Sequence, residues 1–199
     1  MRVPVFIIAG HNEHFKGAKM ASVLKGFEWE HDYTTDLQKR VVGKVQNSIS
    51  LKGSQMFPVV DEEHKLNSQV VDFVNRKNVP GARGLDIHFN NDNPRATGTE
   101  IILHPNTSEE NKRRGTWLVT SISDLLDIPH RMREPGRAWI HPNETFVGEG
   151  RLPILEKTRP PVAILEVCFG NEQDLAKYID KRDQVADLIK QAYFYKSFK

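Results

Sequence analysis

The sequence contains one cysteine, Cys168, among its 199 residues. A single thiol cannot form a disulfide within the chain, so nothing in the fold requires an oxidising compartment. No apolar run approaches the roughly 20 residues that a membrane-spanning helix needs, so we expect no insertion into a membrane. Strong charge of one sign is also missing, because 28 Lys and Arg stand against 26 Asp and Glu. Without a basic stripe interleaved with aromatic residues, the sequence argues against nucleic-acid binding.

The sequence as printed also lacks the pattern of a signal peptide. Residues 3–9 are apolar, but this run is too short, and it continues into His11 without a cleavage site of small residues. We therefore expect a protein that is made in the cytoplasm. If its substrate lies outside the cell, another factor must release it.

What is present is the composition of an ordinary globular protein, with 38% hydrophobic and 27% charged residues. The length suits a single domain over residues 1–199. Apolar, β-branched runs alternate with segments of helical period, which predicts an α/β fold with a mostly parallel central sheet flanked by helices. We expect a long loop-rich segment at about 127–160, where Pro and Gly recur. The predicted strands are 3–9, 56–60, 84–89, 99–103 and 162–169, and the predicted helices are 34–49, 67–76, 108–126 and a long one after Asn171 that could be interrupted at 180–183.

Three predicted strands carry a polar residue inside or just after their apolar run. His11 follows the first strand, His88 lies in a middle strand, and Glu166 lies in the last. The active sites of α/β proteins lie at the carboxyl ends of their parallel strands. A single buried His is more often a hydrogen-bonded core residue than a ligand. A buried carboxylate is costly unless it is paired or used, so the sequence favours a function for Glu166 most clearly.

These residue types match the needs of catalytic zinc. Such a site takes three protein ligands and keeps a fourth position open. His11 and His88 supply two ligands, and a carboxylate of the loop before the first helix, either Glu28 or Glu30, supplies the third. A separate carboxylate must take a proton from the water that the metal activates, and Glu166 is the natural candidate.

The segments that carry these residues resemble one family. Their order is Ile-Ile-Ala-Gly-His ending at His11, a loop ending in Glu, Asp-Ile-His-Phe-Asn at 86–90, and Pro-Val-Ala-Ile-Leu-Glu-Val-Cys-Phe at 161–169. This order is similar to that of the zinc-dependent N-acetylmuramoyl-L-alanine amidases, which are the catalytic domains of autolysins and phage endolysins. The resemblance covers nearly the whole chain, from residue 3 to about 193, and the last segment is the most specific.

The resemblance implies an α/β fold with a zinc site at the carboxyl ends of the strands. It implies that His11, a Glu of the N-terminal loop and His88 bind Zn2+, and that Glu166 is the catalytic acid/base. For the loop position it favours Glu30 over Glu28. In the family this ligand lies about four residues before the polar residue that opens the first helix, which here is Thr34.

The activity that the resemblance implies is cleavage of the amide bond between N-acetylmuramic acid and L-alanine in peptidoglycan. The partner would be the bacterial cell wall, and we expect a monomer. Synthesis in a host cytoplasm without a signal peptide suits a phage endolysin that reaches the wall after release. A bacterial enzyme printed without its leader or partner domains would look the same.

Two positions depart from the common pattern of the family. Asn12 stands where many relatives have Gly after the first His, and His14 in the same loop is a rival ligand, although we expect it to be exposed. Asp86 stands where many relatives have Ser, two residues before the second His. Its carboxylate could orient a metal ligand or lie on the other side of the strand. Neither departure removes a predicted ligand.

Two other functions remain open from the sequence. A zinc peptidase that trims the stem peptide would need an Arg to hold a terminal carboxylate, and the candidates are Arg131, Arg133, Arg137 and Arg151. A catalytically silent domain that binds the cell wall would not need both His residues and Glu166. The complete set therefore argues against a silent domain.

Overall fold

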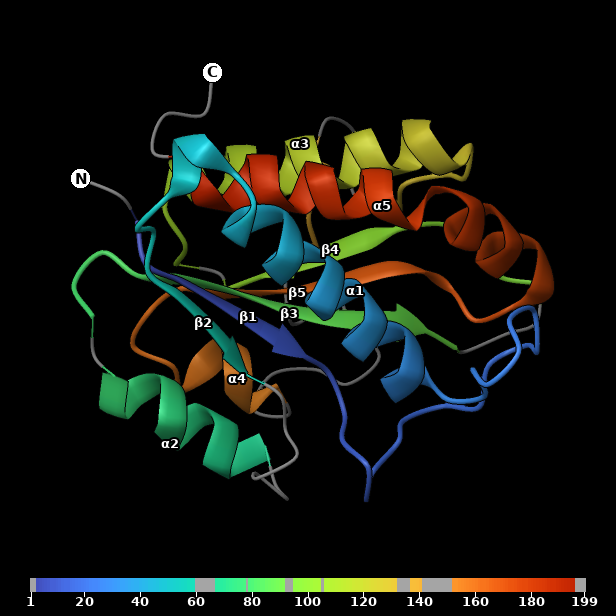
Figure 1. Cartoon of the computed structure of the whole chain (residues 1–199), viewed down its shortest axis with the longest axis horizontal. Helices are drawn as coiled ribbons and strands as arrows, with labels where there is room; N and C mark the ends of the chain where they lie inside the picture. The colour runs from blue at the N-terminus through green and yellow to red at the C-terminus, as the bar shows by residue number, and fades with distance from the viewer. Residues whose placement is uncertain are drawn as a thin grey trace.

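The computed structural model describes residues 3–59, 67–77, 79–91, 95–104, 106–131, 137–140 and 152–195. Its strands are β1 (Val5–Ala9), β2 (Met56–Val59), β3 (Arg83–Asn90), β4 (Glu100–Leu103) and β5 (Val162–Phe169). They form one sheet in the order β2-β1-β3-β5-β4 (Figure 1). The first four strands of this order run parallel, and β4 pairs with β5 antiparallel. The predicted α/β fold with a mostly parallel sheet is confirmed.

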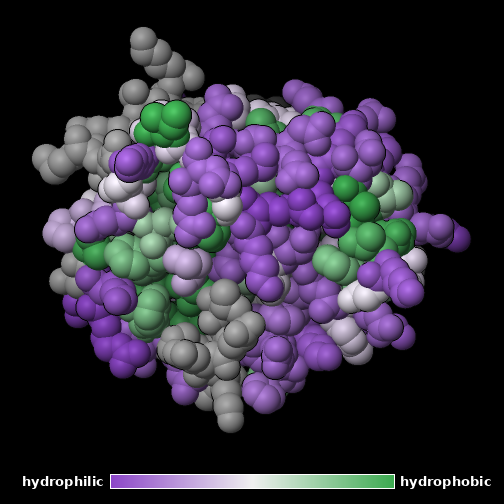
Figure 2. All heavy atoms as spheres, viewed as in Figure 1, coloured by the Kyte–Doolittle hydropathy of each residue, from purple (hydrophilic) through white to green (hydrophobic). Residues whose placement is uncertain are grey.

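Helices cover both faces of the sheet. They are α1 (Glu30–Gln46), α2 (Asn67–Lys77), α3 (Glu109–Leu126), α4 (Pro153–Glu156) and α5 (Glu172–Phe194), with a short 3-10 helix η1 (Ile49–Leu51) after α1. The helices α1, α3 and α5 lie on one face of the sheet, and α2 and α4 lie on the other (Figure 1). None of the described helices is both long and apolar enough to cross a membrane. Figure 2 shows one face of the molecule, on which hydrophilic side chains predominate and hydrophobic ones form separate patches.

Two hydrophobic cores hold the sheet between these helix layers. In β1, Val5 and Ile7 join the larger core with α1, α3 and α5, whereas Phe6 and Ile8 join the smaller core with α2 and α4. Successive side chains of a strand face opposite sides, so both faces of the sheet are buried. This double burial explains the continuous apolar runs in the sequence. It also fixes the register, because a slip of one residue would exchange the two cores.

The two edge strands end the sheet in different ways. In β2, Pro58 pairs in register with Ile7 of β1 and has no backbone N–H to donate. Beside β4, the N–H of Ile140 donates to the carbonyl oxygen of Ile101 at 2.8 Å, and its carbonyl oxygen accepts the N–H of Leu103 at 3.0 Å. The segment at Ile140 therefore lies along the outer side of β4.

The first helix begins earlier than its apolar pattern predicts. The prediction was 34–49, but α1 begins at Glu30. The Asp32 carboxylate accepts the backbone N–H groups of Glu28 and Trp29, both at 2.9 Å. Asp32, which lies in the first turn, therefore provides the acceptor for backbone donors at the start of the helix. The predicted end was also wrong, because Ile49 is 92% exposed and lies in η1. Ile49 continues the four-residue spacing of apolar residues in the sequence, but Val45 is the last of them that faces the core.

Two further differences lie in the second half of the chain. The helix α5 continues through residues 180–183 without interruption. Asp183 lies on its outer surface, where its carboxylate pairs with Arg40 of α1 at 2.9 Å. The loop-rich segment predicted at about 127–160 contains the short helix α4, which has Pro153 in its first turn. Residues 132–136 and 141–151 of that segment lie outside the described residues.

One buried carboxylate ties three segments together. Asp174, in the first turn of α5, is fully buried. It accepts hydrogen bonds from the Thr97 hydroxyl at 2.7 Å, the Gly98 N–H at 3.1 Å and the Phe169 N–H at 3.3 Å. These donors belong to the loop before β4 and to the end of β5. Asp174 therefore fixes the carboxyl end of β5 relative to its neighbours.

We expect the change Asp174→Ala to lower the free energy of unfolding by about 3 kcal/mol, because it leaves two buried backbone donors without an acceptor and removes the partner of the Thr97 hydroxyl. Chemical denaturation followed by circular dichroism measures this loss. The matched control is Asp180→Ala on the same helix, where the side chain is exposed. The control should change stability by no more than about 0.5 kcal/mol. Equal stabilities of the two variants would contradict the role of Asp174.

Candidate metal centre

Four residues lie side by side across the carboxyl end of the sheet. The register pairs His88 of β3 with Glu166 of β5, and Glu166 with Glu100 of β4. On the other side of β3, the N–H of Gly10 donates to the carbonyl oxygen of Ile87 at 2.8 Å, which places Gly10 next to His88. Paired side chains face the same side of a sheet, and neighbouring strands lie about 4.8 Å apart. His88, Glu166 and Glu100 therefore project from one face in a row.

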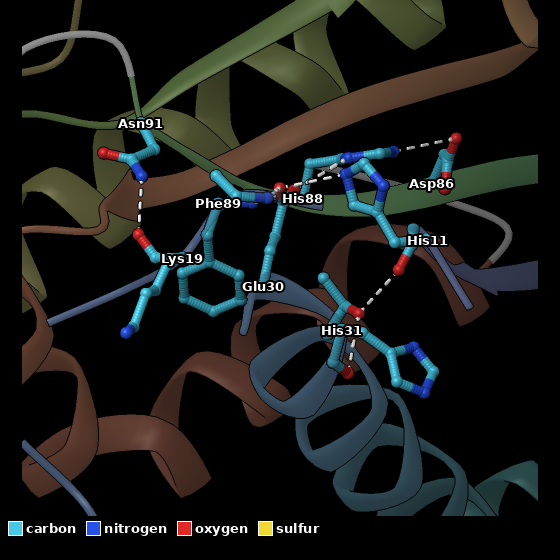
Figure 3. Close-up of polar contacts among 11 residues, drawn as sticks. His11, Lys19, Glu30, His31, Asp86, His88, Phe89 and Asn91 are labelled. Carbon is cyan, nitrogen blue, oxygen red and sulfur yellow. Dashed lines mark hydrogen bonds and ion pairs between the residues drawn. The ribbon is translucent and has the colours of Figure 1, made fainter. Parts of the chain in front are cut away.

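His11, Glu30 and His88 meet at one end of this row (Figure 3). His11 Nε2 lies 2.9 Å from Glu30 Oε2, and His88 Nδ1 lies 3.0 Å from Glu30 Oε1. The two imidazole rings meet edge to face, with centroids 4.9 Å apart. One ligand atom from each residue lies within 4.8 Å of the other two, and within the described ranges this is the one such group of His, Cys, Asp and Glu. The three residues predicted as metal ligands are thus brought together.

The Glu30 carboxylate is held by backbone donors on both of its oxygens. Oε1 accepts the N–H of Phe89 at 3.1 Å, and Oε2 accepts the N–H of Ala18 at 3.3 Å. Glu30 is also the first residue of α1, where the partial positive charge of the helix start favours a carboxylate. Because its side chain is almost fully buried, the carboxylate is fixed before any ligand arrives.

A sharp turn after β1 directs His11 towards Glu30. His11 has φ 64°, in the left-handed region that side chains other than Gly rarely adopt, at a cost on the order of 1 kcal/mol. The buried Asn12 stabilises the turn, because its side-chain oxygen accepts the N–H groups of His14 and Phe15, both at 2.8 Å. The backbone of Gly17 lies close to both His11 and Glu30. A Cβ at Gly17 would lie 2.6 Å from Glu30 Oε2 and 2.6 Å from a ring carbon of His11.

His88 lies between two carboxylates (Figure 3). Its Nδ1 faces Glu30, and its Nε2 lies 3.3 Å from Asp86 Oδ2. The Cε1–Nε2 edge of the ring packs on Gly10, where a Cβ would lie 2.4 Å and 2.5 Å from these two atoms. The absence of a side chain at Gly10 therefore makes room for the ring.

The charges of this group are strongly perturbed. Burial of Glu30 opposes its negative charge, but hydrogen bonds with His11 and His88 outweigh burial and hold the pKa of Glu30 well below its usual range. Burial of His88 opposes a positive charge, but Asp86 and Glu30 outweigh burial and raise the pKa of His88 well above its usual value. Buried carboxylates here are stabilised by positive charge, which is what a cation would supply.

Glu166 has the opposite perturbation. It is half-buried, and its Oε2 is buried with no hydrogen-bond partner among the described residues. Burial raises the pKa of Glu166 to about 8, with the charges of Glu30, Glu100 and Asp86 adding to the rise and His88 opposing it. A carboxyl group with a pKa near neutrality can both take and return a proton, which is the requirement for general acid–base chemistry.

The residues fit a zinc ion. Two imidazole nitrogens and one carboxylate are a common ligand set of catalytic zinc, with bonds of about 2.0–2.2 Å. In a tetrahedral site these bonds place ligand atoms about 3.3 Å apart. Each oxygen of Glu30 lies at hydrogen-bond distance from one imidazole, at 2.9 Å and 3.0 Å, and one ligand atom of each of the three residues lies within 4.8 Å of the others. The absence of side chains at Gly10 and Gly17 leaves room for the rings and the carboxylate.

The other predicted ligands lie elsewhere. Glu28 and His14 have exposed side chains and do not belong to the metal group. The geometry thus agrees with Glu30 over Glu28, but the reason given from the sequence was wrong, because α1 begins at Glu30 itself rather than four residues later. His31 is buried beside Glu30, yet its Nδ1 faces the Thr35 hydroxyl at 3.4 Å.

The candidate arginines are engaged or lie outside the described residues. Arg131 Nε lies 3.5 Å from Glu100 Oε2, and its guanidinium lies 5.2 Å from the centre of the Phe169 ring. Arg137 stacks over Trp139 at 4.7 Å. Arg133 and Arg151 fall in the segments that the structure does not describe. Arg131 therefore contacts the row that contains Glu166, through Glu100.

Some residues of the site escaped the sequence prediction. Glu100 lies beside Glu166, and a buried carboxylate in an apolar strand was the signal that identified Glu166, so the same argument could have found it. The backbone donors of Ala18 and Phe89 carry no side-chain identity, and no sequence signal points to them. In the sequence, Gly10 could be recognised only as part of the segment Ile-Ile-Ala-Gly-His that ends at His11.

The comparison with known proteins agrees with this geometry. The Amidase_3 family model, described as N-acetylmuramoyl-L-alanine amidase, matches residues 5–193. An N-acetylmuramoyl-L-alanine amidase from Clostridium difficile 630 has a TM-score of 0.73 at 18% identity, over 96% of this chain and 94% of that one. The catalytic domain of an endolysin targeting Clostridia difficile has a TM-score of 0.69 at 16% identity, over 96% of both chains. The catalytic domain of the amidase CwlV from Bacillus (Paenibacillus) polymyxa var. colistinus has a TM-score of 0.69 at 17% identity, over 96% and 95%.

No curated protein matches the chain at a significant level. At identities below 20%, the likeness to solved structures establishes the fold alone. The family match is different, because it spans nearly the whole chain and includes the metal group and Glu166. The chain therefore belongs to the Amidase_3 family of N-acetylmuramoyl-L-alanine amidases.

Proposed function

We propose that this peptidoglycan amidase is zinc-dependent, that His11, Glu30 and His88 hold the metal, and that Glu166 is its general acid/base. The observation that supports this most strongly is the meeting of two imidazoles and one carboxylate beside a second carboxylate with a raised pKa. The bond cleaved would be the amide between N-acetylmuramic acid and L-alanine. Each predicted ligand offers an atom of the type that zinc prefers.

Zinc, when bound, polarises the scissile carbonyl and lowers the pKa of a water molecule. Glu166 takes a proton from that water on its carboxylate and later gives it to the nitrogen of the leaving L-alanine. The low-dielectric surroundings that raise the pKa of Glu166 to about 8 let it hold the proton between these two transfers. Glu30, anchored by two backbone N–H groups, keeps His11 and His88 aimed at one point.

A zinc peptidase that trims the stem peptide is less well supported. It would need an arginine able to hold a terminal carboxylate. Arg131 contacts Glu100 and Phe169, and Arg137 stacks on Trp139, so both described candidates have other contacts. A silent wall-binding domain is less well supported too, because such a domain would have no use for the metal group and a protonatable Glu166 beside it.

The biological setting stays a prediction from the sequence. The solved relatives include the catalytic domain of an endolysin and amidases of bacteria, with similar TM-scores. We propose an endolysin-type enzyme that acts as a monomer, is made in a host cytoplasm and reaches the cell wall after release.

We expect digestion of purified peptidoglycan to release stem peptides that begin with L-alanine. A chelator should stop the release and added zinc should restore it, because the proposed reaction needs a metal ion to polarise the scissile carbonyl and to activate water. Mass spectrometry of the soluble products measures this result. Shortened stem peptides still attached to glycan would instead identify a peptidase, and an unchanged digest would contradict both activities.

We expect Glu166→Gln to lower kcat by at least about 10²–10⁴-fold, the usual contribution of a general acid/base, while zinc stays bound. Gln has the shape of Glu but cannot take the proton. The matched control, Glu172→Gln, changes an exposed carboxylate at the start of α5 and should leave kcat unchanged. Metal content is read by atomic absorption. More than a few per cent of activity in Glu166→Gln would overturn its assignment.

We expect Gly10→Ala to weaken zinc binding by roughly tenfold or more, because the new methyl group would displace the ring of His88. The matched control is Gly43→Ala in α1, where nothing lies within 4 Å of an added Cβ. The control should keep its zinc affinity and gain stability, since Ala favours a helix over Gly by roughly 0.5–1 kcal/mol. Competition with a coloured chelator gives both affinities, and equal values would contradict the close packing of His88 on Gly10.

A further inference from the structure

We propose that Asp86 is a positioning residue of the metal centre. Its carboxylate accepts the Nε2–H of His88 and so leaves the lone pair of Nδ1 for the metal. The inference rests on the proposed zinc function and adds a residue to it.

The contact is built into the strand. Asp86 and His88 are two residues apart in β3, so their side chains leave the same face of the sheet. Ile87 between them points into the larger core on the other face. The resulting distance between Asp86 Oδ2 and His88 Nε2 is 3.3 Å, that of an ion pair and just beyond the usual range of an N–H···O hydrogen bond.

The arrangement of the ring determines which nitrogen is left for a metal. Nδ1 lies 3.0 Å from Glu30, and Glu30 in turn lies 2.9 Å from His11, so Nδ1 faces the metal group. Nε2 faces Asp86 on the opposite side (Figure 3). A neutral imidazole has one N–H and one lone pair, and a metal takes the lone pair. Rotating the ring by 180° would turn carbon atoms towards both carboxylates, so the observed orientation is the one that uses both nitrogens.

Asp86 has little else to do in the fold. It is 7% exposed, and its Oδ1 has no hydrogen-bond partner within the described residues. A carboxylate that serves only the fold normally has several donors, as Asp174 does. Burying a charge with one donor is costly, and the cost is offset where a cation stands nearby.

The expected consequence is tighter zinc binding. Outer carboxylates of metal-ligating histidines fix the ring and increase its basicity, and their loss weakens metal affinity by about 10–100-fold. We therefore expect Asp86→Ala to raise the zinc Kd by that factor, measured by competition with a chromophoric chelator. Asp86→Asn should give a smaller rise, because its amide oxygen still accepts the Nε2–H.

The matched control is Asp32→Asn. It removes a carboxylate charge two residues from Glu30, and Asp32 contacts backbone groups of the α1 start rather than the His88 ring. Its zinc Kd should stay within about threefold of the wild-type value. A Kd that rises equally in Asp32→Asn and Asp86→Asn would mean that only net charge matters, which would overturn the positioning role.

A second readout reports the proton itself. In zinc-loaded wild-type protein labelled with 15N, the side-chain spectrum should show His88 protonated at Nε2 and metal-bound at Nδ1. Protonation at Nδ1, or a zinc Kd in Asp86→Ala equal to that of the wild type, would overturn the inference. Asp86→Asn preserves shape and keeps the test valid if the Ala variant unfolds. A wild-type protein that binds no zinc would instead overturn the proposed function itself.

Discussion

The register of β3 between β1 and β5 is the constraint on which the site depends. It aligns Gly10, His88 and Glu166 across neighbouring strands, so that the space left by Gly10, the proposed metal ligand and the proposed proton acceptor lie in a row. A slip of one residue would turn His88 into the larger core and Ile87 into the site. The two cores prevent such a slip, because each strand buries apolar side chains on both faces. The packing of the whole sheet is thus what sets the chemistry at its end.

The site concentrates negative charge where water is scarce. Glu30, Asp86, Glu166 and Glu100 all lie at the same end of the sheet, and their mutual repulsion is visible in the raised pKa of Glu166. His88 lies between Asp86 and Glu30, and these two carboxylates raise its pKa well above the usual value. Such an arrangement is unfavourable by itself and becomes favourable when a cation enters. The carboxylates also differ in role: hydrogen bonds with His11 and His88 hold the pKa of Glu30 low, whereas burial raises the pKa of Glu166, whose Oε2 has no hydrogen-bond partner among the described residues.

Much of this arrangement could be predicted from the sequence, and the failures have physical causes. The strand and helix pattern gave the fold class, since doubly buried strands are distinct in composition from amphipathic helices. Glu166 was singled out because a buried carboxylate is costly, whereas His11 and His88 were singled out by their place at strand ends and by the family resemblance. The start of α1 was missed because Asp32 acts from the first turn, ahead of the apolar stripe. The partner of Asp86 was left open, although the two-residue spacing on one strand already predicts that Asp86 and His88 leave the same face.

The two edges of the sheet affect whether copies of the protein can pair with one another. An open strand edge is a template on which a second copy can pair, and natural sheets protect such edges. Here Pro58 interrupts the row of donors on β2, and the segment at Ile140 lies along β4. Both rims of the sheet are therefore poor templates for strand addition. Such protection disfavours edge-to-edge pairing between copies of the chain.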